Sequence, residues 1–263
     1  MHKEIIIIIP HYNNLKGLYK SVTSIKEKIK IDIIIIDDGS QQEINIANLR
    51  KDYKLGRIYY KKQQTNKGIA QALNVGIDFA RKNEYKYIAR LDAGDICCAN
   101  KHSKQYRYLK KNSDVKLLGT WARVVDSKGT ELFNLKHPIG YEQIKKMMYL
   151  NSAFVHPSVM FSSEILKEIK GYPLNYFAAE DYAFFFDVIN NFKAENYPEI
   201  LLDYLVDEDS ISSKYRKQQV KNRIKIMLKN FYFGFHPIYG ILRSLILLLF
   251  SRQATNFIKT RTS

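Results

Sequence analysis

The chain has 263 residues and a mass of 30.8 kDa; 46% of its residues are hydrophobic and 26% are charged. These values exclude a disordered protein, a collagen-like repeat and a small disulfide-bonded scaffold. The length allows one large domain, or one domain with an appendage. The formal net charge of +16 predicts an anionic partner, which could be a nucleic acid, an anionic membrane or a phosphorylated ligand.

We expect no export signal in this sequence. The apolar run from Ile5 to Ile9 ends at Pro10, which makes it shorter than the core of a signal peptide. A late apolar stretch is interrupted by Arg243 and is too short to span a bilayer. A helix at the membrane interface is the alternative that this stretch allows. The two cysteines, Cys97 and Cys98, are neighbours. Because a disulfide between them has unfavourable geometry, we expect a reducing compartment.

The first half of the chain predicts alternating strands and helices. Isoleucine-rich runs with little polar alternation are typical of buried parallel strands, and apolar residues at helical spacing separate them. Strands are predicted at 4–9, 31–36, 57–61 and 85–91, and helices at 15–29 and 67–81. This alternation predicts an α/β fold with a largely parallel sheet.

Beyond about residue 112 the pattern is looser. The predicted elements are strands at 115–125, 157–161 and 200–206 and helices at 141–150 and 181–190. No internal repeat or low-complexity linker divides this part of the chain, so it continues the same unit.

Positive charge is concentrated at the end of the chain. Of the 42 basic and 26 acidic residues, 11 basic and no acidic ones lie in 210–263. Interleaved basic, aromatic and aliphatic residues suit a helix on an anionic membrane surface; a helical layer packed on the body is the alternative. No zinc-finger, basic-zipper or RNA-recognition signature accompanies the charge, so no nucleic-acid partner is expected. We predict a body over 1–212 and a basic amphipathic helical region over 213–263.

Polar segments follow three of the predicted strands, namely Pro10–Asn14, Asp37–Ser40 and Asp92–Asp95. Ligands of open parallel sheets bind beyond the carboxyl ends of the strands, so we expect a functional site where these segments meet. No Gly-rich phosphate loop is present. Phosphate would therefore be handled by a metal and by basic side chains, for which Lys67 and Arg90 are candidates.

The residue types in these segments suggest individual roles. Asp37 and Asp38 could hydrogen-bond a base or a ribose, and Tyr12 could stack on a nucleobase. Asp92 and Asp95 carry the oxygen ligands that a hard divalent cation such as Mg²⁺ prefers. These roles predict a nucleotide site with a metal beside it.

The order of the segments resembles the family 2 glycosyltransferases, which are inverting enzymes with a GT-A fold. The resemblance covers roughly residues 3–212. It rests on six segments in register: the first strand with Pro10, Tyr12 and Asn13, then Ile34–Ser40, Asn66–Gly76, Ile88–Asp95, His156–Met160 with Gly171 and Tyr172, and Ala179–Tyr182. It implies a Rossmann-like nucleotide-binding domain with a mostly parallel central sheet, followed here by the basic helical C-terminal region.

The resemblance and the residue types together imply a set of site residues. The residues expected to bind the nucleotide sugar are Pro10, Tyr12, Asn13, Asp37, Asp38, Lys67, Arg90 and Asp92. Asp92 and Asp95 match the aspartate motif that meets Mn²⁺ or Mg²⁺. Asp181 matches the general base with Glu180 beside it, and His156 lies on the acceptor side. An inverting transfer needs a carboxylate to take the acceptor proton and positive charge on the departing diphosphate.

The sequence departs from the family pattern in three places. Gly94 stands where the aspartate motif often has a further Asp. Leu205 and Asp207 stand where many members carry Arg and His. No Gln-x-x-Arg-Trp motif follows, so processive polymer synthesis is not expected.

The expected function is a nonprocessive, inverting, metal-dependent hexosyltransferase. It would move one hexose from a nucleotide sugar, with a UDP-sugar as the expected donor, to a hydroxyl of a lipid-linked oligosaccharide in bacterial surface polysaccharide (O-antigen or capsule) synthesis. The expected location is cytoplasmic, peripheral at the inner face of the cytoplasmic membrane. Two alternatives stay open: a sugar nucleotidyltransferase, and a catalytically degenerate scaffold that binds a nucleotide or a membrane.

Overall fold

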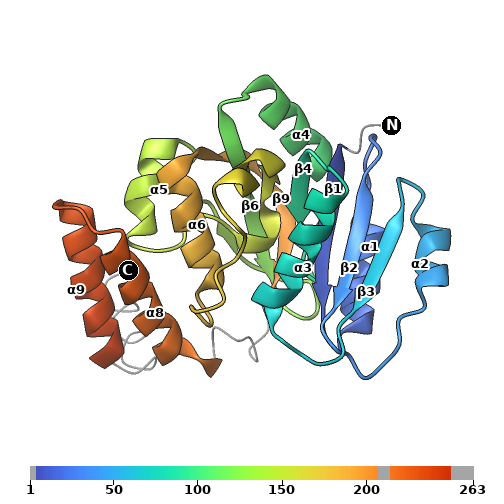
Figure 1. Ribbon diagram of the computed structural model, residues 1–263, viewed down its shortest axis with the longest axis horizontal. Helices are drawn as coiled ribbons and strands as arrows, with labels where there is room; N and C mark the ends of the chain where they lie inside the picture. Colours follow the sequence, from blue (N-terminus) through green and yellow to red (C-terminus); the bar gives the residue numbers. More distant parts are fainter. Residues whose placement is uncertain (1–3, 207–213, 250–263) are drawn as a thin grey trace.

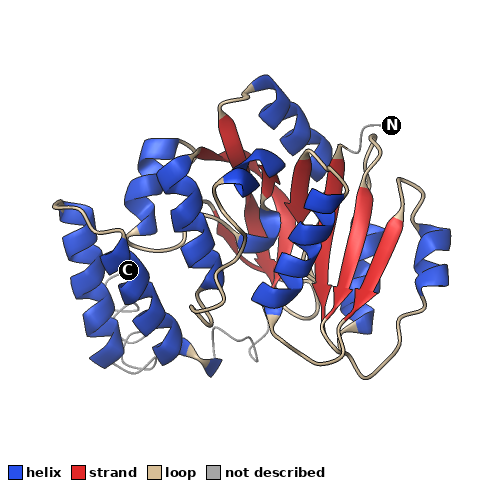
Figure 2. Cartoon of the chain, in the orientation of Figure 1, coloured by secondary structure: helices blue, strands red, loops and turns tan. Residues whose placement is uncertain are grey.

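The computed structural model describes residues 4–206 and 214–249. In these ranges a central sheet has helices on both faces (Figures 1 and 2). The strands are β1 (Ile5–His11), β2 (Asp32–Asp37), β3 (Ile58–Lys62), β4 (Tyr87–Arg90), β5 (Ile96–Cys97), β6 (Val115–Val125), β7 (Glu131–Leu135), β8 (Met160–Ser162) and β9 (Lys193–Leu205). The helices are α1 (Leu15–Ser24), α2 (Ile46–Asp52), α3 (Ile69–Lys82), α4 (Lys101–Lys111), α5 (Tyr141–Met148), α6 (Glu180–Asn191), α8 (Arg216–Lys229) and α9 (Phe235–Leu249), with 3₁₀ turns η1 (His156–Ser158) and η2 (Ser163–Lys167).

The strands form one sheet in the order β3-β2-β1-β4-β8-β6-β9-β5, and β7 pairs with β6. Among the first four strands, the neighbouring pairs β1–β2, β1–β4 and β2–β3 are all parallel. Strand β8 is antiparallel to both β4 and β6, whereas β9 is parallel to β6. The predicted α/β architecture is therefore confirmed. The carboxyl ends of β1, β2 and β3 lie together at the lower edge in Figure 1, where α3 also begins.

The isoleucine runs form strands because both faces of the sheet are covered. Alternate side chains enter two cores. Ile6 and Ile8 of β1 pack with residues of α3 and α6, whereas Ile5, Ile7 and Ile9 pack with residues of α1 and α2. All five are at most 3% exposed.

The prediction was wrong at several elements. Residues 157–161 were predicted to be one strand, but Pro157 lies in η1 and the strand begins at Met160. Strand β9 begins at Lys193 rather than at residue 200. Its first half was missed because charged residues alternate with buried ones there and because it contains Pro198. The first helix ends at Ser24 instead of continuing to residue 29. The elements α2, α4, β5 and β7 were not predicted.

The described part of the basic C-terminal region is helical, as predicted. Helix α8 packs on α6, and its Ile224 and Met227 join the core that contains Phe186. Gly240 lets α9 approach Tyr149, since a Cβ at this glycine would lie 2.0 Å from the Tyr149 carbonyl oxygen. No helix within 4–206 and 214–249 is both long and apolar enough to cross a bilayer. The division at 212/213 falls outside the described residues and stays a prediction.

Candidate active site

Backbone and side-chain hydrogen bonds join the loops that follow β1, β2 and β4. The Asp38 N–H donates to the His11 carbonyl oxygen (2.8 Å), and the Asn13 N–H donates to Ser40 Oγ (2.9 Å). Asn14 Nδ2 donates to the Ala93 carbonyl oxygen (2.8 Å), while its Oδ1 caps α1. The three polar segments therefore meet at one edge of the sheet.

The two aspartates that follow β2 hold the surrounding loops. Asp37 is fully buried and accepts hydrogen bonds from the Ser40 N–H (2.8 Å) and the Tyr60 hydroxyl (2.9 Å). Asp38 accepts from the backbone N–H groups of Lys67 (2.9 Å) and Gly68 (2.8 Å). Burial raises the pKa of Asp38. Asp38 thus fixes the entry to α3, whereas Asp37 joins the turn after β2 to β3. The predicted contact of both with a nucleotide stays a prediction.

The other residues predicted to bind nucleotide differ in exposure. Pro10 is buried in β1, whereas Tyr12 is half exposed at the edge of the sheet. Asn13 adopts a left-handed conformation (φ 48°) and accepts from the Gln41 N–H (2.9 Å). Tyr12 alone of these three therefore has a large exposed side chain, and the predicted contact of all three with a nucleotide stays a prediction.

Arg90 and Asp92 form a bidentate ion pair at the end of β4. Arg90 Nε lies 2.7 Å from Asp92 Oδ1, and Nη2 lies 2.9 Å from Oδ2. The Arg90 side chain is 3% exposed and that of Asp92 is 29% exposed. Burial opposes the charge of Arg90, but Asp92, Tyr172 and Asp181 together outweigh it, and the pKa of Arg90 is raised. Arg90 is thus held behind Asp92 rather than at the open surface.

A serine on α1 fixes the turn from Asp92 to Asp95. Ser21 Oγ accepts from the Gly94 N–H (2.9 Å) and lies within hydrogen-bond distance of the carbonyl oxygens of Asp92 (3.0 Å) and Asp95 (2.7 Å). Gly94 takes a φ of +125° in this turn, which strongly favours glycine. Nothing in the sequence distinguished Ser21 from the other polar residues of its helix.

The carboxylates of Asp92 and Asp95 are the candidate ligands of a divalent cation. Asp95 Oδ1 accepts from the Leu205 N–H (2.9 Å), whereas Oδ2 is buried without a hydrogen-bond partner among the described residues. Burial, and then the charge of Asp92, raise the pKa of Asp95 well above its usual value. A cation would offset both effects, so the residues fit one.

The protein side of this cation site is small. Within 4–206 and 214–249, no three His, Cys, Asp or Glu residues form a metal-binding group. A bound cation would take its remaining ligands from phosphate and water, as Mg²⁺ commonly does. Leu205 lies next to this turn, since a Cβ on Gly94 would lie 3.4 Å from its Cδ2. Asp207, the other departure from the family pattern, lies outside the described residues.

Glu180 and Asp181 begin α6. Asp181 Oδ1 accepts from the Tyr182 N–H (2.7 Å) in the first turn, where the helix dipole favours a carboxylate. Burial nevertheless raises the pKa of Asp181. Burial and the neighbouring Asp181 also raise the pKa of Glu180. A carboxylate with a raised pKa is a stronger proton acceptor once it is ionised.

His156 connects Asp181 to the aspartate turn. Its Nε2 contacts Arg90 Nη1 and lies 3.0 Å from the Tyr172 hydroxyl, and its Nδ1 lies 3.7 Å from Asp181 Oδ2. Burial, and then Arg90, lower the pKa of His156 well below its usual value, which disfavours the protonated ring. The Tyr172 backbone is held at both its N–H and its carbonyl by the Asn74 amide (2.7 and 2.8 Å). His156 is therefore a buried link, and its predicted role toward an acceptor stays a prediction.

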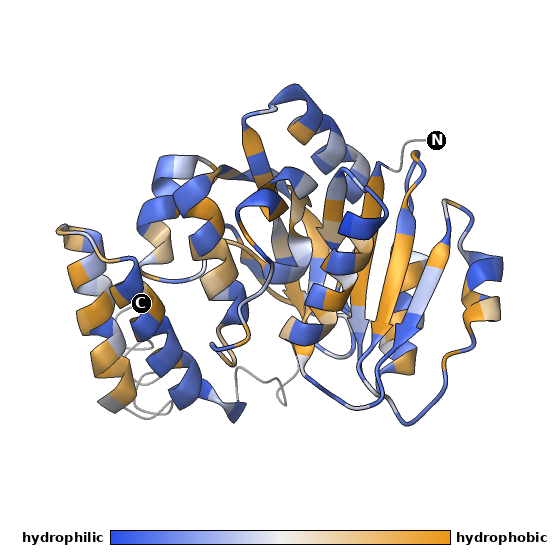
Figure 3. Cartoon of the chain, in the orientation of Figure 1, coloured by the Kyte–Doolittle hydropathy of each residue, from blue (hydrophilic) through white to orange (hydrophobic). Residues whose placement is uncertain are grey.

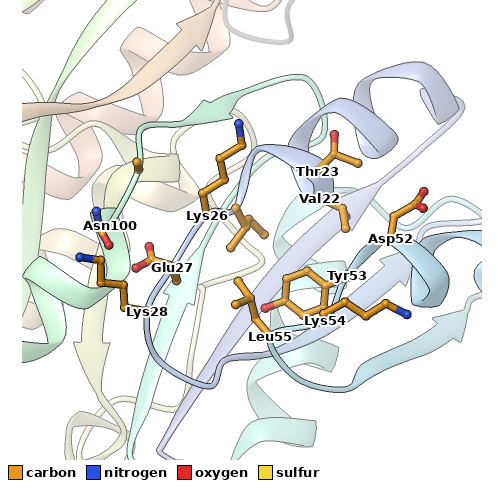
Figure 4. Close-up of a pocket in the computed structure, with 12 residues that line it drawn as sticks. Val22, Thr23, Lys26, Glu27, Lys28, Asp52, Tyr53, Lys54, Leu55 and Asn100 are labelled. Carbon is orange, nitrogen blue, oxygen red and sulfur yellow. The ribbon is translucent and has the colours of Figure 1, made fainter.

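The cavities among the described residues include one beside the candidate site and a second one lined by other residues. One, of about 370 Å³, is lined by Lys67, Phe177, Glu180 and neighbouring residues, and so adjoins the candidate site. The other, of about 450 Å³, is lined by residues at and just beyond the ends of α1 (22–28) and α2 (52–55) and by Ala99 and Asn100 (Figure 4). Asp92, Asp95 and Asp181 are not among the residues that line the second cavity.

Comparison with known proteins identifies the family. The model of the family described as glycosyl transferase family 2 matches residues 6–170. This chain belongs to glycosyl transferase family 2. An uncharacterized glycosyltransferase of Methanocaldococcus jannaschii is 31% identical over 221 residues, which cover 81% of this family 2 chain and 75% of that protein.

Two further relatives of this family 2 chain carry more specific names. The O-antigen biosynthesis glycosyltransferase WbnJ of Escherichia coli is 31% identical over 142 residues, which cover 53% of this chain and 54% of that protein. The UDP-Gal:alpha-D-GlcNAc-diphosphoundecaprenol beta-1,3-galactosyltransferase of Escherichia coli is 25% identical over 225 residues, covering 82% of this chain and 78% of that protein. The chain is thus related to enzymes of polysaccharide biosynthesis.

Solved structures share the fold. S. aureus TarS 1–349 in complex with UDP-GlcNAc has a TM-score of 0.71 at 15% identity, covering 92% of this chain and 71% of that chain. The mannosyltransferase PcManGT from Pyrobaculum calidifontis, in complex with GDP-Man and Mn²⁺, has a TM-score of 0.66 at 14% identity, covering 94% and 70%. At these identities the likeness shows the fold, which is the GT-A fold predicted for this family 2 chain.

Sequence reasoning missed several residues that shape the site. Asn74 and Tyr172 lie inside segments that carry the family resemblance, so a signal for them existed. Ser21 and the buried Lys101 gave none: Lys101 Nζ lies within 3.4 Å of the Arg90 carbonyl oxygen from a helix that was not predicted.

Proposed function

We propose that this glycosyltransferase moves a single hexose from a nucleotide sugar to a hydroxyl of a lipid-linked oligosaccharide, with inversion at the transferred carbon. The observation that carries the proposal is the position of Asp181, an ionisable carboxylate at the start of α6 joined through His156 to the Arg90–Asp92 pair. A base is thereby brought near the candidate diphosphate and metal residues. An in-line displacement needs these two groups on opposite sides of the reacting carbon.

Asp181 is the proposed general base. In its ionised form it takes the proton of the acceptor hydroxyl as the oxygen attacks the sugar, while the bond to the nucleoside diphosphate breaks. Burial raises the pKa of Asp181, so activity should rise with pH through a pKa above the usual aspartate range. Glu180 lines the cavity of about 370 Å³, and its side chain is proposed to orient the hexose or the acceptor there.

Asp92 and Asp95 are the proposed ligands of Mn²⁺ or Mg²⁺. When bound, the cation supplies positive charge to the departing diphosphate. The GT-A structure of PcManGT with GDP-Man and Mn²⁺ supports such a cation, as does the partnerless Oδ2 of Asp95. Arg90 and His156 are proposed positioning residues, because Arg90 holds Asp92 and His156 lies between Arg90 and Asp181.

The relatives support the donor and acceptor classes. The likeness to TarS with UDP-GlcNAc supports a UDP-sugar donor. The relatives named for O-antigen biosynthesis and for a diphosphoundecaprenol acceptor support a lipid-linked oligosaccharide in surface polysaccharide synthesis. Such an acceptor places the proposed reaction at the inner face of the cytoplasmic membrane.

A thermal-shift panel with UDP, GDP, dTDP and CDP, each with and without Mn²⁺, tests the proposal. A ligand that binds the native state at a hundredfold excess over Kd raises the free energy of unfolding by about 2.7 kcal/mol. We expect a metal-dependent shift with UDP that is lost in Asp92→Asn. No shift with any nucleotide would contradict the proposal and favour the degenerate scaffold.

A further inference from the structure

The outward face of α9 is apolar. Six exposed residues share this face at spacings of three, one, three, three and one, which is the repeat of one side of a helix. This outer stripe consists of Phe235, Ile238, Tyr239, Leu242, Leu245 and Ile246, which are 45–73% exposed. The opposite face is already packed on the protein, with Gly240 and Ser244 buried and Ile241 and Leu248 against the core. The stripe is therefore not the face that holds α9 in place.

The turn before α9 extends the apolar surface. Phe231, Tyr232 and Phe233 are all exposed, and Phe233 is 94% exposed. Figure 3 shows α9 mostly in hydrophobic colours at the side of the molecule, next to a more hydrophilic α8. Contiguous exposed apolar surfaces of this kind mark binding sites for proteins or membranes.

The neighbouring helix α8 presents a row of lysines. Lys217, Lys221, Lys225 and Lys229 are spaced four apart and all are exposed, so they share one face of the helix. Of these, Lys229 lies within 3.5 Å of Asp187. Helices α8 and α9 pack against each other. An apolar row and a cationic row thus lie on two adjacent helices.

We propose that α8 and α9 form a surface that binds an anionic lipid bilayer. The outer stripe of α9 enters the boundary between headgroups and acyl chains, and the α8 lysines bind the lipid phosphates. Charge complementarity favours this occupant. A second copy of the chain would bring lysine-rich surfaces close together, and like charges at an interface are unfavourable. This inference goes beyond the proposed transfer and does not depend on it.

Co-sedimentation of the full chain with lipid vesicles tests the inference. Vesicles of phosphatidylcholine with about 30% phosphatidylglycerol are compared with pure phosphatidylcholine, at 0.1 and 0.5 M salt. We expect binding to the anionic vesicles that weakens in high salt. The double variant Leu242→Ser/Ile246→Ser should bind at least tenfold more weakly. In Lys221→Gln/Lys225→Gln we expect a loss of about fivefold per lysine.

Matched control variants lie elsewhere on the surface. Leu132→Ser/Phe133→Ser removes two side chains on β7 that are each 53% exposed, and Lys110→Gln/Lys111→Gln removes two exposed lysines of α4. Both controls should bind vesicles like the wild-type chain. Melting temperatures within about 2 °C of the wild type show that all variants are folded, since surface changes away from packed features have small effects.

Three results would overturn the inference. The first is failure of the wild-type chain to bind anionic vesicles, and the second is unchanged vesicle binding by the α9 variant. The third is a wild-type chain that is a dimer in sedimentation velocity and binds no vesicles, with an α9 variant that is a monomer. Nucleotide-induced thermal shifts are measured on the same variants. If vesicles bind but no nucleotide does, the proposed transfer fails while the membrane surface stands.

Discussion

Replacement of Arg90 by Gln should change both stability and the pH dependence of transfer. Arg90 makes two charge-assisted hydrogen bonds to Asp92, of 2.7 and 2.9 Å, from a side chain that is 3% exposed. Hydrogen bonds to charged groups contribute about 1.5–3 kcal/mol each. Since Asp92 is 29% exposed, water would replace part of this loss. We expect the free energy of unfolding to fall by about 2–4 kcal/mol, which lowers Tm by about 4–16 °C.

The same change should alter the titration of Asp181. Burial raises the pKa of Asp181, and the Tyr182 N–H and the charge of Arg90 oppose that rise. A nearby opposite charge lowers a carboxyl pKa, and Arg90 acts on Asp181 across the ring of His156. Without Arg90 the acidic limb of kcat/KM should therefore move to higher pH, because the pKa of Asp181 is then raised further.

The assay is kcat/KM for transfer between pH 4.5 and 8, with donor binding measured in parallel. Arg90→Lys is the matched control, since it keeps the charge but loses the planar fork. It should lose stability while its acidic limb stays within a few tenths of a unit of the wild type. An Arg90→Gln variant that is destabilised but has an unmoved limb, or a limb moved to lower pH, would refute the role assigned to Arg90.

Two other positions give distinct expectations. The pKa of Asp95 is raised in the folded state. Protonation of Asp95 therefore stabilises the folded state at low pH, and this contribution is lost as the pH rises from about 4 through the raised pKa. Without metal, the Tm of the wild type should fall relative to that of Asp95→Asn between pH 4 and 8; parallel Tm curves would contradict the raised pKa. In Ser21→Ala the Gly94 N–H loses its acceptor, which should cost about 1–3 kcal/mol and weaken nucleotide binding. The control is Ser24→Ala, which removes the acceptor of the Cys97 N–H (3.0 Å) and should lower Tm without weakening nucleotide binding. Equal nucleotide affinity in Ser21→Ala and Ser24→Ala would show that the Asp92–Asp95 turn does not shape the site.

The parallel half of the fold was predictable because its strands are buried on both faces. A run such as Ile33–Ile36 has no polar face, which is typical of a strand that is covered on both sides. Helix α4 escaped prediction for the opposite reason: its buried residues include Lys101, His102 and Gln105, so no apolar period marks it. There, Glu27 accepts from the backbone N–H and ring Nδ1 of His102, a pairing that compensates burial but leaves no local signal.

The candidate site divides in the same way. Segments at successive strand ends indicated where Asp38 and Asp92 would lie, since the carboxyl ends of parallel strands share an edge. The contact of Arg90 with His156 joins residues 66 positions apart and depends on η1 replacing part of a predicted strand. The sequence therefore indicated the place of the site, whereas the buried pairing within it required the structure.

The most direct test of the proposed transfer is the rate of sugar transfer by Asp181→Asn, measured beside its affinity for the donor nucleotide. Asn keeps the size of the side chain and its acceptor for the Tyr182 N–H but cannot take a proton. We predict that transfer falls by about 10²–10⁴, the usual contribution of a general base, while the metal-dependent thermal shift with UDP is retained. Transfer at the wild-type rate would contradict the account, because the acceptor proton would then leave by another route.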